Sequence, residues 1–480
     1  MKSILGALLI SFFLVVNLLQ KQEILDPDPT PAGDILLQDQ EIYFPVIVNL
    51  MEEGPQINAP HFSGDVNSAQ SAIFWFGELN LTDNYTDIRV GYNNQELVVR
   101  LQVFDRRLWF DSTPAASDLT DWDAASLFLD LRGGVGSKPH SDAYLLVGQL
   151  NNNPQRETWQ TGYRGNGSSW VSNGFAFTTL SGWRGNAPND DQDDDGWSLV
   201  FRVPFTSLGL SGPPPTASKW GIAVALHDRD SAQGSLIPDS HWPADLASDR
   251  PETWNTLSFG LPVFQSPPVL PAGSATIRHR LNGASVTDVH VGGEMDCGQA
   301  FAPIYFNGWG DANHGGSTEL NIQNQLDVAD WPCFSKLYIT FPLDAIPSGK
   351  VILSADLQLH LFGNSGEGAS PPPQRSLVHV MTIQQSWQEN SITWNNAPQP
   401  QENVSQSWVY PLDNFPGWPG IPYDWDLSAA VAAAYAAGKP LRIVLYSSDG
   451  AIHSGKYFVP SETGDWNQVA RPTLFITWGN

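Results

Sequence analysis

Apolar and polar residues alternate with a period of two in several segments of the chain. The segments lie in both halves, at residues 97–104, 199–205, 337–341, 357–361, 441–445 and 474–478. Successive side chains of a β-strand point to opposite faces, so this alternation predicts strands with one buried face. An alanine-rich stretch from Ser428 to Ala437 departs from the pattern. Gly438 and Pro440 follow it, which predicts a helix that ends there.

Proline-rich stretches divide the chain into segments. Residues 262–274 hold several prolines, which lack the amide hydrogen that a central strand needs, and they predict a linker. Residues 24–58, rich in Asp, Pro and Gln, predict a tether. The remaining segments, 59–261 and 275–480, each have the length of one sandwich. The expected fold class is all-β, with two β-sandwich, jelly-roll-like domains in tandem and one short helix in the second.

The first 23 residues have the layout of a secretory signal. Lys2 precedes a mostly apolar run from Ile4 to Leu19, and acidic residues follow. The run is shorter than the ~20 residues that span a bilayer comfortably. Residues 1–23 are therefore expected to be a signal peptide or a signal anchor, and the protein to be secreted or at the cell surface. No other membrane contact is expected.

Composition narrows the class of partner. The 480 residues include 24 Lys and Arg against 50 Asp and Glu, which gives a formal net charge of -26. A chain this acidic repels phosphate backbones, so no nucleic acid partner is expected. Gly (42) and Pro (37) are abundant and aromatic residues reach 11%, which favours short strands and many turns.

The two cysteines, Cys297 and Cys333, are candidates for a disulfide because an exported chain meets an oxidising compartment. The alternative is two separate buried thiols. Two cysteines without a nearby histidine pair cannot form a structural zinc site.

An acidic loop offers a candidate metal site. Asp191, Asp193 and Asp195 stand at alternate positions before Gly196, which matches the D-x-D-x-D-G arrangement of calcium loops. The twelfth position is Arg202 instead of a bidentate Glu, so the loop is not an EF-hand. The two readings are a hairpin loop that holds calcium and a solvated acidic turn. Calcium, as a structural ion, is the expected cofactor.

Common catalytic signatures are absent. The chain has no G-x-S-x-G, no H-E-x-x-H and no G-x-x-x-x-G-K-[ST]. His227, in His227-Asp228-Arg229-Asp230, has the chemistry of a ligand or base, but a salt-bridged strand end is the favoured reading. No catalytic residue is assigned.

Motifs over residues 59–260 resemble the family 9 carbohydrate-binding module superfamily. They are, in chain order, Ala59-Pro60, Leu97 to Asp105, Asp123 to Asp130, Asp142-Ala143-Tyr144, Gly196-Trp197 to Pro204-Phe205, Trp220-Gly221 and Phe259-Gly260. The resemblance implies a β-sandwich that grips sugars between tryptophans and often carries calcium. Ser126 stands where the family has an acidic residue, and Leu146 and Gly148 stand where it has Arg and Asn. Those family residues bind sugar hydroxyls, so the family's sugar specificity does not carry over.

Motifs over residues 276–478 resemble the DNRLRE-type domain, which is related to family 96 carbohydrate-binding modules. They are, in chain order, Asp311 to Gly316, Phe341-Pro342-Leu343 with Ile346-Pro347, Ser386 to Pro398, Trp425-Asp426-Leu427, and Arg471 to Leu474. The resemblance implies a jelly roll attached to secreted polysaccharide-degrading or surface proteins, often without catalytic activity of its own.

Tryptophans are the candidate sugar contacts. A sugar ring has an apolar face that an exposed flat aromatic ring can cover, and 19 tryptophans exceed what two cores need. Trp254 falls near one tryptophan of family 9 and Trp122 lies two positions from the other, so Trp122, Trp242 and Trp254 are the first ligand-binding candidates. For each of them the alternative is burial in the core. Further tryptophans in loop-like surroundings are Trp159, Trp170, Trp183, Trp309 and Trp418.

Together these features predict an exported, non-catalytic protein that binds polysaccharide or another glycan with two β-sandwich modules. One alternative is a structural or adhesive cell-surface protein without sugar binding. A second is a polysaccharide-degrading enzyme, which would need a facing pair of carboxylates in a cleft.

Overall fold

A computed structural model describes residues 54–151, 156–293, 304–325 and 333–480. Residues Glu52–Asn480 form one compact unit. The predicted signal segment 1–23 and most of the predicted tether lie outside the described residues. Among the helices that are described, none is long and apolar enough to cross a membrane.

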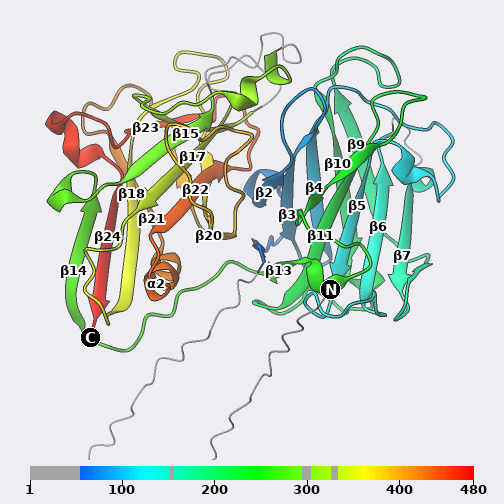
Figure 1. The fold of residues 1–480 in the computed structure, drawn as a ribbon, viewed down its shortest axis with the longest axis horizontal. Coiled ribbons are helices and arrows are strands. Elements are labelled where there is room, and N and C mark those ends of the chain that lie inside the picture. Colours follow the sequence, from blue (N-terminus) through cyan, green and yellow to red (C-terminus); the bar gives the residue numbers. More distant parts are fainter. Residues whose placement is uncertain (1–53, 152–155, 294–303, 326–332) are drawn as a thin grey trace, which may run out of the picture. The chain divides into compact units, whose positions relative to one another are not determined.

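The first half is built from strands that form two layers (Figure 1). They are β1 (Gln56–Ala59), β2 (Ala72–Phe76), β3 (Tyr85–Tyr92), β4 (Glu96–Phe104), β5 (Ala124–Asp130), β6 (Ala143–Gln149), β7 (Gln160–Gly165), β8 (Trp170–Ser172), β9 (Thr178–Arg184), β10 (Gly196–Pro204), β11 (Lys219–Asp228), β12 (Ile237–Trp242) and β13 (Asn255–Phe259). One layer is the antiparallel sheet β2-β3-β4-β10-β9. In the other, β11 pairs with β5 on one side and with β12 and β13 on the other, and β6, β7 and β8 follow β5.

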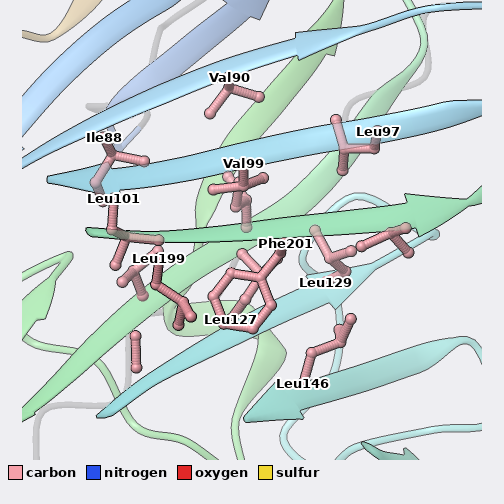
Figure 2. Packing of buried hydrophobic residues seen from close by; sticks show 14 of the residues in the cluster. Ile88, Val90, Leu97, Val99, Leu101, Leu127, Leu129, Leu146, Leu199 and Phe201 are labelled. Atoms are coloured by element: carbon pink, nitrogen blue, oxygen red, sulfur yellow. The ribbon is translucent and has the colours of Figure 1, made fainter. Parts of the chain in front are cut away.

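The core of the first half lies between these two sheets. Figure 2 shows Val99 of β4 and Phe201 of β10 close to Leu127 and Leu129 of β5, and all four side chains are buried. Burial of each such side chain stabilises the fold by about 1.5–3 kcal/mol. Because side chains alternate along a strand, Ser126 and Phe128 of β5 lie on the opposite, outer face of its sheet.

The second half contains a further set of strands and helix α2 (Ser428–Ala436). The strands are β14 (Pro271–Arg278), β15 (Thr287–Gly292), β16 (Leu320–Asn324), β17 (Phe334–Phe341), β18 (Val351–Asn364), β19 (Ser376–Thr382), β20 (Glu402–Val409), β21 (Ile421–Asp426), β22 (Leu441–Ser447), β23 (Lys456–Phe458) and β24 (Thr473–Gly479). One sheet runs β15-β17-β22-β19-β20 and the other β14-β24-β18-β21, all antiparallel. β14 overlaps the last four residues of the predicted linker.

The predicted all-β fold class is confirmed: strands occupy the predicted alternating segments, and α2 occupies the predicted helix. The amide and hydroxyl groups of Ser428 both donate to Asp426, which fixes the first turn of α2. Gly438, with φ +63°, stands just after the helix, where a left-handed residue ends it. Ala430 and Val431 pack the helix into the core of the second half.

Strand β1 links the two halves. It pairs in parallel with β13 of the first half, and Gln56 also pairs with Glu402 at the start of β20. The side chain of Asn403 accepts from the Asn58 amide at 2.7 Å and donates to the Asn58 carbonyl at 2.9 Å. The backbone of the first half is therefore hydrogen-bonded directly to the second.

A third buried cluster contains side chains from both halves, and we call it the seam. Its members are Ile73, Trp75, Leu79, Tyr85 and Phe104 with Val289, Val291, Tyr305, Phe306, Cys333, Phe334, Tyr338, Met381, Ile383, Ile392, Trp394, Val444 and Tyr446.

Lys336 of β17 lies against the seam and is fully buried. Its Nζ is 3.5 Å from the ring centroid of Trp394, 4.0 Å from that of Trp75 and 4.5 Å from that of Tyr85. Burial lowers the pKa of Lys336 well below its usual value. Aromatic rings from both halves therefore attract the charged form of this amine, and so does Asp87.

Truncating Trp394 tests the seam. Trp394→Ala removes a ring that is 3% exposed and leaves a cavity beside Lys336, so we expect the free energy of unfolding to fall by about 3–5 kcal/mol. Urea unfolding followed by fluorescence and circular dichroism measures it. Trp183→Ala, at a ring that is 38% exposed, is the control and should change stability little. Separate unfolding transitions for the two halves of the unmodified chain would contradict a shared seam.

Candidate functional site

The three tryptophans predicted to contact ligand lie in different surroundings. Trp242 of β12 is 1% exposed and packs on Phe74, with ring centroids 3.9 Å apart. Its position opposite Val224 of β11 turns the side chain toward the core, so the ring offers no face to a ligand. Trp122 is half-buried, and the Arg229 guanidinium lies 4.4 Å from its ring centroid, which covers one face.

Trp254 is only 7% exposed and stacks on Trp170, with ring centroids 6.3 Å apart and an interplanar angle of 4°. A sugar between two rings needs two contacts of about 3.5–4 Å each, so this spacing leaves no room for one. The indole N–H groups donate to the carbonyls of Ala247 and Ser248. The pair closes one end of the outer face of the β5–β8 sheet.

A pocket of about 240 Å³ opens on this outer face, and we call it the sheet-face pocket. Ser126 of β5, Leu145 and Val147 of β6, and Tyr163 of β7 contribute to it. The complete lining is Ala116, Ser117, Thr120, Ser126, Leu145, Val147, Thr161, Tyr163 and Trp170. The lining combines three apolar side chains, two aromatic rings and several hydroxyls, which is the composition of a small-ligand site.

The acidic loop has arginine partners. Asp193 lies 3.2 Å from Arg106 and 3.0 Å from Arg107, and Arg107 also donates to the Asp191 carbonyl. The Asp195 carbonyl accepts from Arg184 at 3.1 Å. Guanidinium groups thus balance part of the loop's charge, and the structure does not bring Asp191, Asp193 and Asp195 together as a metal-ligand group.

A different set of carboxylates meets in the interior. Asp105, Asp123 and Asp228 are all buried, and one potential ligand atom from each lies within 4.8 Å of the others. Asp105 follows β4, Asp123 precedes β5 and Asp228 ends β11. We call this set the carboxylate cluster.

Backbone and indole N–H groups hold the cluster only in part. Asp123 accepts from the amides of Trp109 at 2.7 Å and Arg229 at 3.0 Å. Asp105 accepts from the Arg107 amide at 2.9 Å and from the Trp197 indole at 3.2 Å. The Oδ1 atom of Asp228 is buried without a hydrogen-bond partner.

The electrostatics of the cluster favour a cation. Burial raises the pKa of Asp105 and Asp123 well above its usual value, and the neighbouring carboxylates add to the rise. Burial and Asp230 raise the pKa of Asp228 to about 7. Three carboxylates buried in one site must bind protons or a metal ion, and carboxylate oxygens are preferred ligands of Ca²⁺.

All three residues lie in segments that the sequence analysis singled out, but the sequence alone could not show that they meet in space. Asp105 and Asp123 end and begin family 9 motifs, and Asp228 lies in the His227–Asp230 run. Each is next to a strand end, and only the pairing of β5 with β11 brings two of those ends together.

The second half carries an exposed group of aromatic side chains, which we call the aromatic patch. It comprises Phe362 of β18, Phe415 and Trp418 before β21, and Trp466 in the 3₁₀ helix η8 (Asp465–Ala470). Trp418 is central, with ring centroids 5.2 Å from Phe415, 5.3 Å from Trp466 and 5.7 Å from Phe362. Trp466 is 69% exposed, Phe415 53% and Trp418 49%.

The neighbourhood of the aromatic patch combines flat rings with polar groups. Gly464 makes room for Trp466, because a Cβ there would lie 2.8 Å from the indole. Gln358 donates to Asp424 at 3.0 Å on the paired strands β18 and β21. Sequence reasoning named Trp418 but missed Trp466, which lies in a short helix that no alternation marks.

Two second-half motifs meet around a pocket of about 340 Å³, lined by Asn313, Gly315, Gly316, Glu389 and Asn390. The Asn313 amide donates to the carbonyls of Glu389 at 2.7 Å and Ile392 at 2.6 Å. The Glu389 carboxylate accepts from the Gly316 amide at 3.2 Å. These bonds fasten the two loops together, so a structural role accounts for the motif residues.

Cys333 is buried just before β17. Its expected partner, Cys297, lies outside the described residues, so the disulfide stays a prediction.

Comparisons with known proteins give one family match and matches to solved structures. Residues 305–477 match the model of carbohydrate-binding module family 96. A family 9 carbohydrate-binding module from Caldicellulosiruptor kristjanssonii, solved with cellotriose, is 15% identical, covers 45% of this chain and 99% of its own, and has a TM-score of 0.31. A second family 9 structure from that organism, solved with glucose, is 14% identical, covers 44% and 100%, and also has a TM-score of 0.31. No curated protein sequence matches the chain.

The family 96 resemblance predicted for the second half is thus confirmed over residues 305–477. This range contains every member of the aromatic patch. Modules of this kind are associated with binding rather than catalysis. The solved structures add nothing to the description of the first half, which rests on its own strands and core.

The raised pKa values predict how stability depends on pH in chelator-treated protein. Asp228 titrates near pH 7 when folded and near 4 when unfolded, so the folded state holds more protons between these values. We expect stability to fall as pH rises from 4 to 7, by up to about 4 kcal/mol for three pKa units. Urea unfolding at several pH values measures this, and Asp228→Asn should flatten the dependence. A rise in stability over this range that Asp228→Asn leaves unchanged would contradict it.

Proposed function

We propose that the protein is an exported, non-catalytic carbohydrate-binding protein that holds polysaccharide on the aromatic patch. The observation that carries this proposal is the exposure of Phe415, Trp418 and Trp466, by about half or more, around a shared centre in the family 96 segment. Large aromatic rings gathered in water are unusual in soluble proteins and mark interaction sites.

Sugar chemistry fits this surface better than protein docking does. Pyranose rings have flat C–H faces that cover indole rings, and a rim of hydroxyls that exchange bonds with water at little net gain. The rings of the patch stand at 72° and 82° to one another, so they offer faces in several directions instead of one flat apolar plane. Gln358 and Asp424 are polar side chains on β18 and β21, and β18 also carries Phe362 of the patch.

The two alternative functions make different predictions. An adhesive surface protein without sugar binding would use the same patch for protein and would bind no glycan. A polysaccharide-degrading enzyme would release reducing sugars. The acidic carboxylates that meet in the described residues are buried, which favours a metal site over glycosidic cleavage.

Affinity electrophoresis against a panel of soluble polysaccharides tests the proposal. We expect retardation of the unmodified chain on at least one polysaccharide, and a 10- to 100-fold weaker interaction for Trp418→Ala/Trp466→Ala, from roughly 1 kcal/mol per ring. Trp183→Ala, another exposed tryptophan, is the matched control. Equal retardation of the double variant and the control would remove the aromatic patch from the proposal, and reducing-sugar release would show an enzyme.

We further propose that the carboxylate cluster binds calcium as a structural ion. Three carboxylates supply oxygen ligands, and the unpartnered Oδ1 of Asp228 points to a missing partner of this kind. A cation there would neutralise charge that burial otherwise penalises and would fasten the ends of β4, β5 and β11. On this proposal calcium binds in the interior instead of in the loop of Asp191, Asp193 and Asp195.

Thermal unfolding with calcium and with chelator distinguishes the two places. Calcium at 100 times its dissociation constant should stabilise the folded chain by about 2.7 kcal/mol and raise the melting temperature. Asp228→Asn should abolish the shift, and Asp191→Asn should keep it. If Asp191→Asn abolished the shift and Asp228→Asn kept it, the calcium site would be the acidic loop.

A further inference from the structure

The outer face of the sheet β14-β24-β18-β21 continues from the aromatic patch along strand β18. Alternate leucines of β18 point into the core of the second half, so Asp356, Gln358 and Phe362 lie on the opposite, outer face. The paired strand β21 adds Asp424 opposite Gln358 and Asp426 opposite Asp356. We call Asp356, Gln358, Asp424 and Asp426 the acidic face. Six residues of a strand span about 20 Å, so this face extends about 20 Å from Phe362.

The negative charge of the acidic face is not balanced by cationic side chains. Asp356 and Asp424 are exposed, and neither forms an ion pair within the described part of the chain. The group that donates to Asp424, at 3.0 Å, is the neutral amide of Gln358. Burial and the neighbouring Asp426 and Asp424 raise the pKa of Asp356, because the carboxylates repel one another. A cationic ligand would relieve this repulsion, and a uronic acid would add to it.

The arginines near the aromatic patch have partners of their own. Arg280 and Arg471 lie 3.5 Å and 2.6 Å from Asp465, in the helix η8 that carries part of the patch. Arg278 of β14 donates to the hydroxyl of Thr473 at 2.8 Å. These bonds compete with any carboxylate of a ligand, so the arginines favour an anionic sugar less than the acidic face disfavours it.

His360 lies on β18 between the aromatic patch and the acidic face, and it also lacks a donor. The side chain is 6% exposed, and its Nδ1 has no hydrogen-bond partner among the described residues. The ring bonds to the backbone of Ala470, and burial lowers its pKa, so the ring is neutral and Nδ1 is an acceptor. Hydroxyl and ammonium groups donate hydrogen bonds to such acceptors, whereas a carboxylate does not.

We propose that the aromatic patch and the acidic face together bind a linear polysaccharide that contains amino sugars, with sugar rings on the patch and ammonium groups at Asp356 and Asp424. The inference rests on the proposed function and adds a class of sugar to it. Phe475 of β24, which is opposite Asp356 and 36% exposed, offers a further ring at the far end of the acidic face.

An amino sugar fits this surface better than a basic peptide does. A lysine side chain carries its charge on a flexible four-carbon stem and loses rotamer freedom when it is held. An amino sugar carries the charge directly on a rigid ring, whose C–H face can cover an indole at the same time. Exposed rings and carboxylates side by side on one face therefore match a polymer in which each unit has both features.

Isothermal titration of the full chain with three hexasaccharides of one β-1,4-glucan backbone tests the inference. Cellohexaose has a hydroxyl at carbon 2, the N-acetylglucosamine hexamer an acetamide and the glucosamine hexamer an amine. At slightly acidic pH, where the amines carry protons, we expect the glucosamine hexamer to bind most tightly. Asp356→Asn and Asp424→Asn should each weaken its binding about two- to fivefold without weakening that of the uncharged hexamers. Asp344→Asn, in the exposed loop before β18, is the matched control because it removes the same charge outside the acidic face.

The outcomes separate this inference from the proposed function. If an uncharged hexamer binds at least as tightly as the glucosamine hexamer, the amino-sugar class is wrong and the proposed function stands. Equal weakening by Asp344→Asn and Asp424→Asn would show attraction by net charge alone, and equally tight binding of hexalysine would assign the acidic face to basic peptides. Tighter binding of hexagalacturonate would also overturn the amino-sugar class. If no hexasaccharide and no polysaccharide binds the unmodified chain, both proposals fail.

Discussion

The seam is the constraint on which the arrangement of the rest of the described chain depends. The Lys336 amine is fully buried, and desolvation opposes its charge and lowers its pKa. The rings of Trp75, Tyr85 and Trp394 lie around it, and Asp87 opposes the fall in its pKa, so neither half alone provides this site. The buried amine therefore ties the docking of the halves to one geometry, a role that buried polar groups play in some other folds.

The seam also explains how this chain uses its aromatic residues. Trp75, Tyr85 and Trp394 pack in the seam between the halves, and Trp242 packs in the core of the first half. Those rings cannot contact a ligand. The rings that remain in water lie mainly in the aromatic patch, where Trp418 contacts three neighbours but packs under none of them.

The sequence was informative where a local pattern determines the structure. Period-two alternation located strands such as 97–104, and Gly438 marked the end of α2. The exposure of the tryptophans was harder to predict, because a side chain such as Trp242 is buried or exposed according to the strand opposite it. The carboxylate cluster was harder still, because Asp123 and Asp228 are about 100 positions apart in the chain and only the β5–β11 register brings them together.

The carboxylate cluster and the hydrogen bond between Ser126 and His227 involve the same two strands, β5 and β11. Asp228 follows His227 directly on β11, and side-chain alternation sends one inward and the other outward. Asp123 likewise stands just before β5, three residues from Ser126. A cation bound between Asp123 and Asp228 would hold the ends of both strands, and with them the 2.9 Å contact between Ser126 and His227. A structural ion on one side of the sheet would thus preserve a hydrogen bond between side chains on the other side.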